Sequence, residues 1–204
     1  MNASRRSSAR TLWTAVRVLL VLTVLLGVGY TAIVTGLGQL AFPFQANGSR
    51  LVDRSGETVG SSLIGQSFRD ADGAPLPRYF QPRPSAAGDG YDATSSSGTN
   101  FGPEHEELVA QIRARRAEIA RFNGVDPAEV PPDALTASAS GLDPHISPAY
   151  ADLQVERVAK ARGLSVDAVR HLVAQWTKEP DLGYLGDRVV NVVQLNLALD
   201  EQEG

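Results

Sequence analysis

The sequence predicts an α+β protein, in which one N-terminal transmembrane helix is followed by a single mixed α+β soluble domain. Three observations lead to this prediction. Residues 18–49 contain no charged side chain, and a helix needs about 20 apolar residues to cross the hydrocarbon core of a bilayer. Apolar residues recur at helical spacing between residues 103 and 178, whereas extended patterns occupy residues 51–68 and 188–199.

The N-terminal region combines a basic segment with a long apolar one. Residues 1–17 carry four arginines and no acidic residue, which predicts a basic N-terminus on the cytoplasmic side of the plasma (inner) membrane. The transmembrane helix is expected at residues 18–41, and the domain at residues 48–204 is then extracytoplasmic. Small residues in the span suit close packing on a partner helix, although a helix that only faces lipid is the simpler interpretation. The anchor residues singled out are Val18, Leu25, Gly27, Thr31 and Val34.

A cleaved signal peptide is the alternative interpretation of this N-terminus, because its first residues are basic. The apolar run exceeds the ~7–15 residues of a signal core, and no clean A-x-A cleavage site follows it. A retained single-pass anchor is therefore the favoured interpretation.

The first part of the outer domain is expected to be extended and irregular. Residues 51–68 predict a β-hairpin, with a turn at residues 53–56. Residues 69–103 are rich in Gly, Pro, Ser and Asp, so they predict a long surface loop that supplies little of a core. A loop of this length is unusual in a compact domain, which indicates a functional role or a partner on which it lies.

Three helices and a strand are expected in the rest of the domain. Pro103 and three glutamates open the first helix, and Gly124 ends it. The second helix covers about residues 148–162 and the third about residues 166–178, each preceded by a serine that can cap it. Residues 188–199 alternate valine and leucine with other side chains, which predicts a strand.

Composition excludes several classes of enzyme. The 204 residues include no cysteine, so disulfides, thiolate nucleophiles and Cys-ligated metals are excluded. Neither of the two lysines follows a glycine, so a Walker-type phosphate loop is absent. His105, His145 and His171 lack the spacing of a zinc site, and no G-x-S-x-G elbow of a hydrolase occurs. We therefore predict no catalytic residue, no metal site and no cofactor held by this chain.

The charge balance argues against nucleic acid as a partner. Of the 19 basic residues, four lie in residues 1–17, which leaves 15 against 23 acidic residues, a balance of −8 for the outer portion. Such a domain has no electrostatic attraction for nucleic acid or anionic lipid. Residues 158–172 are similar to a helix-turn-helix, but two packed helices joined by a short turn explain the same pattern.

Seven collinear segments carry a resemblance to a known family. They are FPFQANGS (42–49), SSLIGQSF (61–68), YFQPRPSA (79–86), SSGTNFGP (96–103), LTASASGLDPHISP (135–148), RVAKARGL (157–164) and VVNVVQLNLALD (189–200). On these segments the chain resembles, almost from end to end, the C subunit of the Kdp-type high-affinity potassium-transporting P-type ATPase. Residues 70–77 look like a local insertion, and the arginine-rich N-terminus is longer than the family pattern.

The resemblance implies a non-enzymatic accessory subunit of an ATP-driven potassium import complex in a lipid membrane. Its partners would be a channel-like potassium-binding subunit, a P-type ATPase subunit that hydrolyses ATP, and a small single-span subunit. The C subunit is described as a catalytic chaperone that aids assembly and raises the ATP affinity of the ATPase subunit. K+ is the transported ion, and ATP is associated with the complex. Because an extracytoplasmic domain cannot touch cytosolic ATP, we expect an indirect effect that passes through the partners.

The loops at residues 79–86, 97–103 and 136–146 are the expected partner interface, from the resemblance and from their loop character. If Arg83 meets a carboxylate of a partner there, Arg83→Lys would weaken assembly, because the bidentate fork is lost. The interface candidates are Tyr79, Phe80, Arg83, Ser85, Thr99, Asn100, Ser138, Ser140 and Asp143.

Two alternatives remain open at this point. One is a membrane-anchored extracytoplasmic enzyme or binding module unrelated to transport, which predicts a pocket with convergent titratable groups. The other is direct nucleotide binding by loop glycines with Gln66 or Gln81, which requires the opposite topology.

Overall fold

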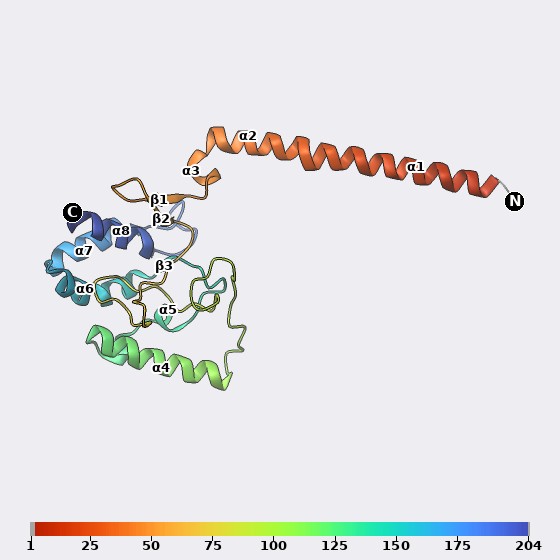
Figure 1. The fold of residues 1–204 in the computed structure, drawn as a ribbon. Helices are drawn as coiled ribbons and strands as arrows, with labels where there is room; N and C mark the ends of the chain where they lie inside the picture. Colours follow the sequence, from red (N-terminus) through yellow and green to blue (C-terminus); the bar gives the residue numbers. More distant parts are fainter. Residues whose placement is uncertain (1–2, 204) are drawn as a thin grey trace. The chain divides into compact units, whose positions relative to one another are not determined.

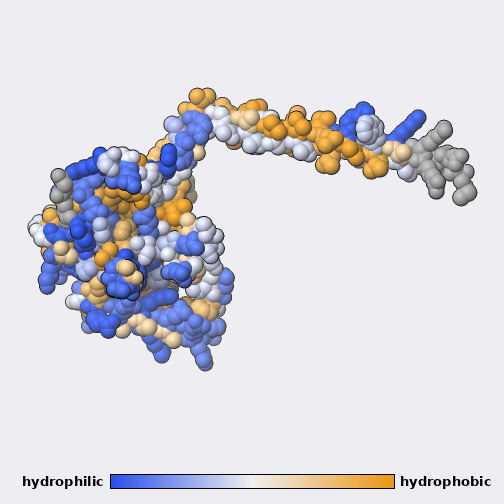
Figure 2. Space-filling model, in the orientation of Figure 1, coloured by the Kyte–Doolittle hydropathy of each residue, from blue (hydrophilic) through white to orange (hydrophobic). Residues whose placement is uncertain are grey.

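The computed structural model describes residues 3–203 and divides into two compact units, residues 1–49 and 50–204 (Figure 1). Within the first unit, Ser8–Ala41 form an apolar helix of 34 residues, in which an 18-residue window reaches a mean hydropathy of 2.3. Apolar side chains follow this helix in Figure 2. By length and composition this helix can cross a membrane. The elements of this unit are α1 (Ala3–Val24), the π-helical segment η1 (Leu25–Tyr30), α2 (Thr31–Ala41) and α3 (Pro43–Ala46).

The π-helical turn changes the hydrogen bonding in the middle of the apolar helix. The hydroxyl of Thr31 donates to the carbonyl oxygen of Leu26, five residues earlier, at 3.3 Å. A Cβ added at Gly27 would meet nothing within 4 Å, so glycine here leaves one face of the helix open. The five anchor residues expected from the sequence all lie in this helix with exposed side chains, and their packing against a partner stays a prediction.

The second unit begins with the hairpin expected from the sequence. Strands β1 (Arg50–Val52) and β2 (Thr58–Ser61) pair antiparallel. The carboxylate of Asp53 accepts hydrogen bonds from the backbone N–H groups of Ser55 and Glu57 at 2.9 and 3.0 Å. These bonds fix the turn, because an Asp side chain can replace a backbone acceptor there.

The three expected helices are present, with two of their ends shifted. The first begins after Pro103, at Glu106, and the third ends at Gln175 rather than at residue 178. Gly124 and Gly163 end their helices in the left-handed region, at φ 73° and 68°, where glycine has no Cβ to clash. The helical elements are α4 (Glu106–Asn123), η2 (Pro127–Glu129), α5 (Pro132–Leu135), α6 (Pro148–Arg162) and α7 (Val166–Gln175).

A three-stranded antiparallel sheet with the order β3-β5-β4 completes the fold, and the mixture of helices and strands confirms the α+β prediction. The strand expected over residues 188–199 is wrong beyond Asn191, where a helix begins. The side-chain oxygen of Asn191 accepts a hydrogen bond from the N–H of Gln194 at 3.1 Å and so caps this helix. The helix buries Val192 and Leu199, two turns apart. The elements are β3 (His145–Ile146), β4 (Thr177–Lys178), β5 (Val189–Asn191) and α8 (Val192–Glu203).

The core is formed mainly by α6, α7, β5 and α8, and part of the long segment 69–103 joins it. The buried peptide group of Phe80 pairs with the side-chain amide of Asn196 at 2.9 and 3.0 Å. That of Gln81 pairs with the side-chain amide of Gln154 at 2.7 and 3.1 Å. Two side-chain amides therefore hold this extended segment as a neighbouring strand would. The expectation that residues 69–103 supply little core is corrected at Phe80, which is fully buried.

Candidate functional site

Four segments that are far apart in the sequence meet in one place, which we call the four-loop cluster (residues 65–66, 83–91, 96–98 and 136–145). The backbone N–H of Gly65 donates to the carbonyl oxygen of Leu142 at 2.8 Å. The backbone N–H of Ser97 donates to the carbonyl oxygen of Ser140 at 3.0 Å. The hydroxyl of Ser85 donates to the carbonyl oxygen of Gly141 at 2.6 Å. Direct hydrogen bonds thus join loops that the sequence shows only as separate polar segments.

Glycines allow these loops to approach one another closely. A Cβ at Gly141, where φ is +70°, would lie 2.7 Å from the carbonyl oxygen of Ser97 and 2.8 Å from the nitrogen of Ala87. A Cβ at Gly65 would lie 2.4 Å from the ring of Tyr91. A Cβ at Gly98 would lie 2.8 Å from the carbonyl oxygen of the 136–145 loop, at residue 139. Side chains at these positions would force the loops apart.

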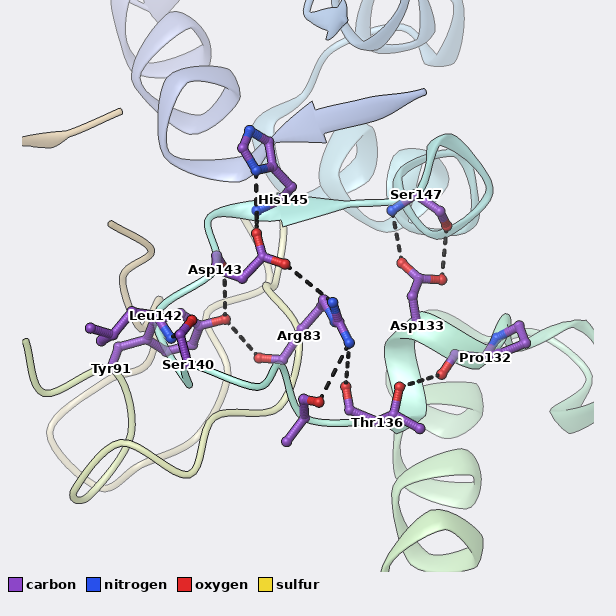
Figure 3. A network of polar contacts seen from close by, with 11 residues as sticks. Arg83, Tyr91, Pro132, Asp133, Thr136, Ser140, Leu142, Asp143, His145 and Ser147 are labelled. Atoms are coloured by element: carbon purple, nitrogen blue, oxygen red, sulfur yellow. Dashed lines mark hydrogen bonds and ion pairs between the residues drawn. The ribbon is translucent and has the colours of Figure 1, made fainter. Parts of the chain in front are cut away.

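An ion-pair network organises the centre of the cluster (Figure 3). The guanidinium of Arg83 donates to the carboxylate of Asp143 at 3.1 Å and to the carbonyl oxygen of Thr136 at 3.3 Å. The other carboxylate oxygen of Asp143 accepts from the backbone N–H of His145 at 2.9 Å and lies 3.2 Å from its Nδ1. Burial alone would raise the pKa of Asp143, but the hydrogen bonds from His145 and the charges of His145 and Arg83 outweigh burial and hold that pKa below its usual value.

Tyr91 connects its own part of the long segment 69–103 to this network. Its hydroxyl donates to the carbonyl oxygen of Arg83 at 2.8 Å, and its backbone N–H donates to the hydroxyl of Ser85 at 2.9 Å. Burial, followed by the charge of Asp143, raises the pKa of the Tyr91 phenol. The phenol is therefore a neutral hydrogen-bond donor at physiological pH.

A cavity of about 440 Å³ lies beside the cluster, between the long segment 69–103 and α4. Arg69, Arg115 and Glu118 contribute charges to its lining, and serines and tyrosines contribute hydroxyls, but no histidine of the described residues lines it. Ser85, in this lining, donates to Gly141 and accepts from the backbone N–H groups of residues 87 and 91. Its hydroxyl is thus held by the backbone and is not paired with a base, unlike the serine of a hydrolase.

No cluster of three or more His, Asp or Glu side chains that could hold a metal ion occurs among the described residues. The arrangement offers shape and hydrogen-bonding groups at loop tips.

The structure brings together only some of the expected interface residues. Ser138 lies in the cluster and is buried, whereas Thr99 is half-buried and Asn100 exposed just beyond it. Tyr79 lies elsewhere, with its hydroxyl donating to the carboxylate of Asp200 on α8 at 3.1 Å. Phe80 is in the core, so its side chain offers no surface to a partner. The cluster members are Arg83, Ser85, Ser138, Ser140 and Asp143.

Arg83 differs from its expected role, because its carboxylate partner belongs to the same chain. The bond to Asp143 joins loops 60 residues apart. A third bond of 3.5 Å reaches the carbonyl oxygen of Ala137. Arg83 therefore holds these loops together, and contact of the cluster with a partner stays a prediction.

Sequence reasoning missed a second polar centre, at Arg157 of α6. The guanidinium of Arg157 donates to the side-chain oxygens of Gln154 and Asn123 at 2.7 and 2.9 Å and to the carbonyl oxygen of Tyr79 at 3.0 Å. It lies 4.4 Å from the ring centroid of Phe122, and burial lowers its pKa to about 10. The available signal was helical periodicity, because Gln154 and Arg157 share the buried face of α6.

Comparison with known proteins identifies the family. The chain matches the family described as KdpC, the K+-transporting ATPase c chain, over residues 12–201. The potassium-transporting ATPase KdpC subunit of Mycobacterium tuberculosis is 50% identical over 193 residues, which cover 94% of this chain and 98% of the relative. The subunits of that name in Kineococcus radiotolerans and Beijerinckia indica are 51% and 50% identical and cover 91% and 89% of each chain. The chain therefore belongs to the KdpC family of K+-transporting ATPase subunits.

Proposed function

We propose that this chain is a non-catalytic accessory subunit of an ATP-driven, high-affinity potassium import complex. It helps the complex to assemble and raises the ATP affinity of the ATPase subunit without binding ATP itself. Its partners are the channel-like potassium-binding subunit, the P-type ATPase subunit and a small single-span subunit. The observation that supports this most is the four-loop cluster, in which polar groups of the family-like segments bind one another and leave loop tips for recognition.

We propose a single-pass topology in the plasma membrane, with the arginine-rich N-terminus in the cytoplasm and the second unit outside. The apolar helix Ser8–Ala41 and the four arginines of residues 1–17 support this orientation. Any effect on cytosolic ATP is then a coupling free energy transmitted through the other subunits. The −8 charge of the outer portion enriches cations near the domain, within a Debye length of about 8 Å at physiological salt.

The two glutamines considered for direct nucleotide binding are already engaged. The side-chain amide of Gln66 donates to the carbonyl oxygen of Val59 at 2.7 Å. That of Gln81 donates to the carbonyl oxygen of Phe68 at 3.0 Å. A nucleotide would have to break bonds that hold the loops, which favours the indirect role.

The indirect role is tested with the purified complex, prepared with and without this chain. We expect the KM for ATP to rise when the chain is left out, and to return when the chain is added back, with the phosphorylation site of the ATPase subunit unchanged. An assembled complex with the same KM for ATP with and without the chain would contradict the proposal.

The topology is tested with single cysteines, because the chain contains none. The hydroxyl of Ser96 donates to the carbonyl oxygen of Ser140, so the exposed neighbour Ala93 is the better position for the outer cysteine. We expect a membrane-impermeant thiol reagent to label the Ala93→Cys variant in intact cells, and the Ser8→Cys variant only after lysis. The reverse pattern would place the second unit in the cytoplasm and make direct ATP contact the leading hypothesis.

A further inference from the structure

We propose that the hairpin at residues 179–188 docks its apolar tip into an apolar recess on another subunit of the transport complex, an inference that rests on the proposed function. This hairpin connects β4 to β5. It belongs neither to the four-loop cluster nor to the cavity beside it.

The hairpin is closed by its own hydrogen bonds. The backbone groups of Asp181 and Leu185 exchange two bonds of 2.9 Å. Between them, Leu182 and Gly183 have φ values of +56° and +81°. Leu182, Gly183 and Tyr184 lie between this pair, and the first two are in the left-handed region, which residues other than glycine, asparagine and aspartate rarely adopt. The tip is thus a defined structure that presents its side chains outward.

The tip exposes large apolar side chains at three of four successive positions. Leu182 is 81% exposed, Tyr184 73% and Leu185 51%. Leu182 and Tyr184 are the most exposed large hydrophobic residues that the structure describes in the second unit. Single exposed leucines are common on protein surfaces, but a contiguous group of this kind indicates an interaction site.

Leu182 is also a poor choice for the turn in which it lies. A left-handed φ favours glycine, asparagine or aspartate, because a positive φ brings the Cβ of other residues close to a carbonyl oxygen. Asparagine at position 182 would relieve this strain and replace an exposed apolar side chain with a polar one. The fold of the isolated chain therefore does not explain leucine at this position.

The charges around the hairpin indicate a protein recess rather than a lipid surface. Lys178 pairs with Asp181 at 3.0 Å, and Arg188 pairs with Glu179 at 2.8 Å. Together with Asp187, these charges give residues 178–188 three acidic and two basic side chains. This part of the chain therefore offers no net positive charge to anionic lipid. The tip itself is uncharged and apolar, and ion pairs lie at the foot of the hairpin. This pattern matches an apolar pocket rimmed by polar groups, as found at the centre of protein interfaces.

The Leu182→Asn variant separates this role from a structural one. We expect it to raise the thermal midpoint of the purified full-length chain in detergent, because the turn is relieved. We also expect it to weaken association with the other purified subunits by at least tenfold in Kd, because a buried anchor is lost. Arg54→Asn, in the turn of the other hairpin, is the control and should leave association unchanged. Unchanged association of Leu182→Asn, with a raised midpoint, would overturn the inference.

Thiol accessibility provides a second, independent measurement. In the Leu182→Cys variant, we expect labelling at least tenfold slower in the assembled complex than in the chain alone in phosphatidylcholine–phosphatidylglycerol vesicles. Equal labelling in a complex that contains the chain would overturn the docking while leaving the proposed function intact. Slow labelling in the vesicles without other subunits would assign the tip to lipid and overturn the inference. Failure of the unaltered chain to associate with the other subunits would instead refute the proposed function.

Discussion

Replacement of Gly141 by alanine tests whether the four-loop cluster depends on close backbone contact. Gly141 has a φ of +70°, at which alanine costs about 1–2 kcal/mol. The new Cβ would lie 2.7 Å from the carbonyl oxygen of Ser97 and 2.8–2.9 Å from the nitrogen and Cβ of Ala87. None of these atoms is the far end of a flexible side chain, so the backbone has to move, and overpacking of this kind costs about 1–3 kcal/mol. We therefore expect a total destabilisation of about 2–5 kcal/mol.

Two other glycines separate the energetic cost of the left-handed backbone from the cost of overpacking. Gly124 has a nearly identical φ of +73° with nothing within 4 Å of an added Cβ, so Gly124→Ala should cost only the ~1–2 kcal/mol of a left-handed alanine. Gly102 has open space and no positive φ, so Gly102→Ala should be neutral or slightly stabilising, by up to about 1 kcal/mol.

The assay is urea unfolding of the full-length chain in detergent micelles, followed by the fluorescence of Trp176. A Trp13→Phe background removes the other of the two tryptophans. The midpoint and slope give the free energy of unfolding of the second unit for each alanine variant. Gly141→Ala no more destabilised than Gly124→Ala would refute the reasoning, because the close approach of three loops would then have no energetic consequence.

Two further predictions concern polar side chains. Asp143→Asn should destabilise the second unit by about 1.5–3 kcal/mol at pH 7, because a charged acceptor of the hydrogen bonds from Arg83 and His145 is lost. The folded-state pKa of Asp143 is depressed, so the stabilisation by its carboxylate is present above the unfolded pKa of ~3.9 and is lost as the pH falls through the folded pKa. The urea midpoints of the unaltered chain should therefore converge with those of Asp143→Asn between pH 7 and 3. A constant difference between the two midpoints would contradict this. Asn191→Ala should cost about 1.5–3 kcal/mol, because it removes the α8 cap and the 2.8 Å bond to the carbonyl oxygen of Ser62. Asn191→Ser keeps a cap acceptor without the bond to Ser62 and should recover about half of the loss in the same assay.

Local signals were enough to predict three helices of the second unit, α4, α6 and α7. Serines 147 and 165 cap α6 and α7, and each hydroxyl accepts from the backbone N–H three residues later. Gly124 and Gly163 end α4 and α6. Each of these signals acts within one turn of helix, so the sequence contains both partners of the interaction.

The last helix could not be predicted in the same way, because its determinants come from distant residues. The run from residue 188 to residue 199 is rich in valine and alternates, which favours a strand when taken alone. In the fold, the side chain of Asn191 bridges the start of α8 and Ser62, 129 residues away. Asn196 lies buried against the peptide group of Phe80. A strand would have pointed Asn196 to solvent and left that peptide group unsatisfied.

The candidate site shows the same division between local and distant information. Loop character selected segments that meet in the fold, since Ser85, Ser140 and Asp143 all lie in the four-loop cluster, but their contact with a partner stays a prediction. It gave no indication that Arg83 and Asp143 pair with each other, because no spacing rule connects loops 60 residues apart. A resemblance to a family identifies segments that matter, but only the fold distinguishes residues that position a loop from residues that a partner can touch.

Leu182 is informative because it has a positive φ while its side chain is 81% exposed. Among the other positive-φ residues of the second unit, the glycines need no further explanation, and Tyr91 is held by hydrogen bonds within the four-loop cluster. At residue 182 the turn and the exposure of the side chain both disfavour leucine, and four of the five charged residues around the hairpin pair with one another. When the requirements of folding and the observed residue disagree on an exposed tip, the requirement that leucine meets lies outside the chain. For a subunit whose polar loops are already bonded to one another, an apolar tip of this kind is the feature that most needs a partner.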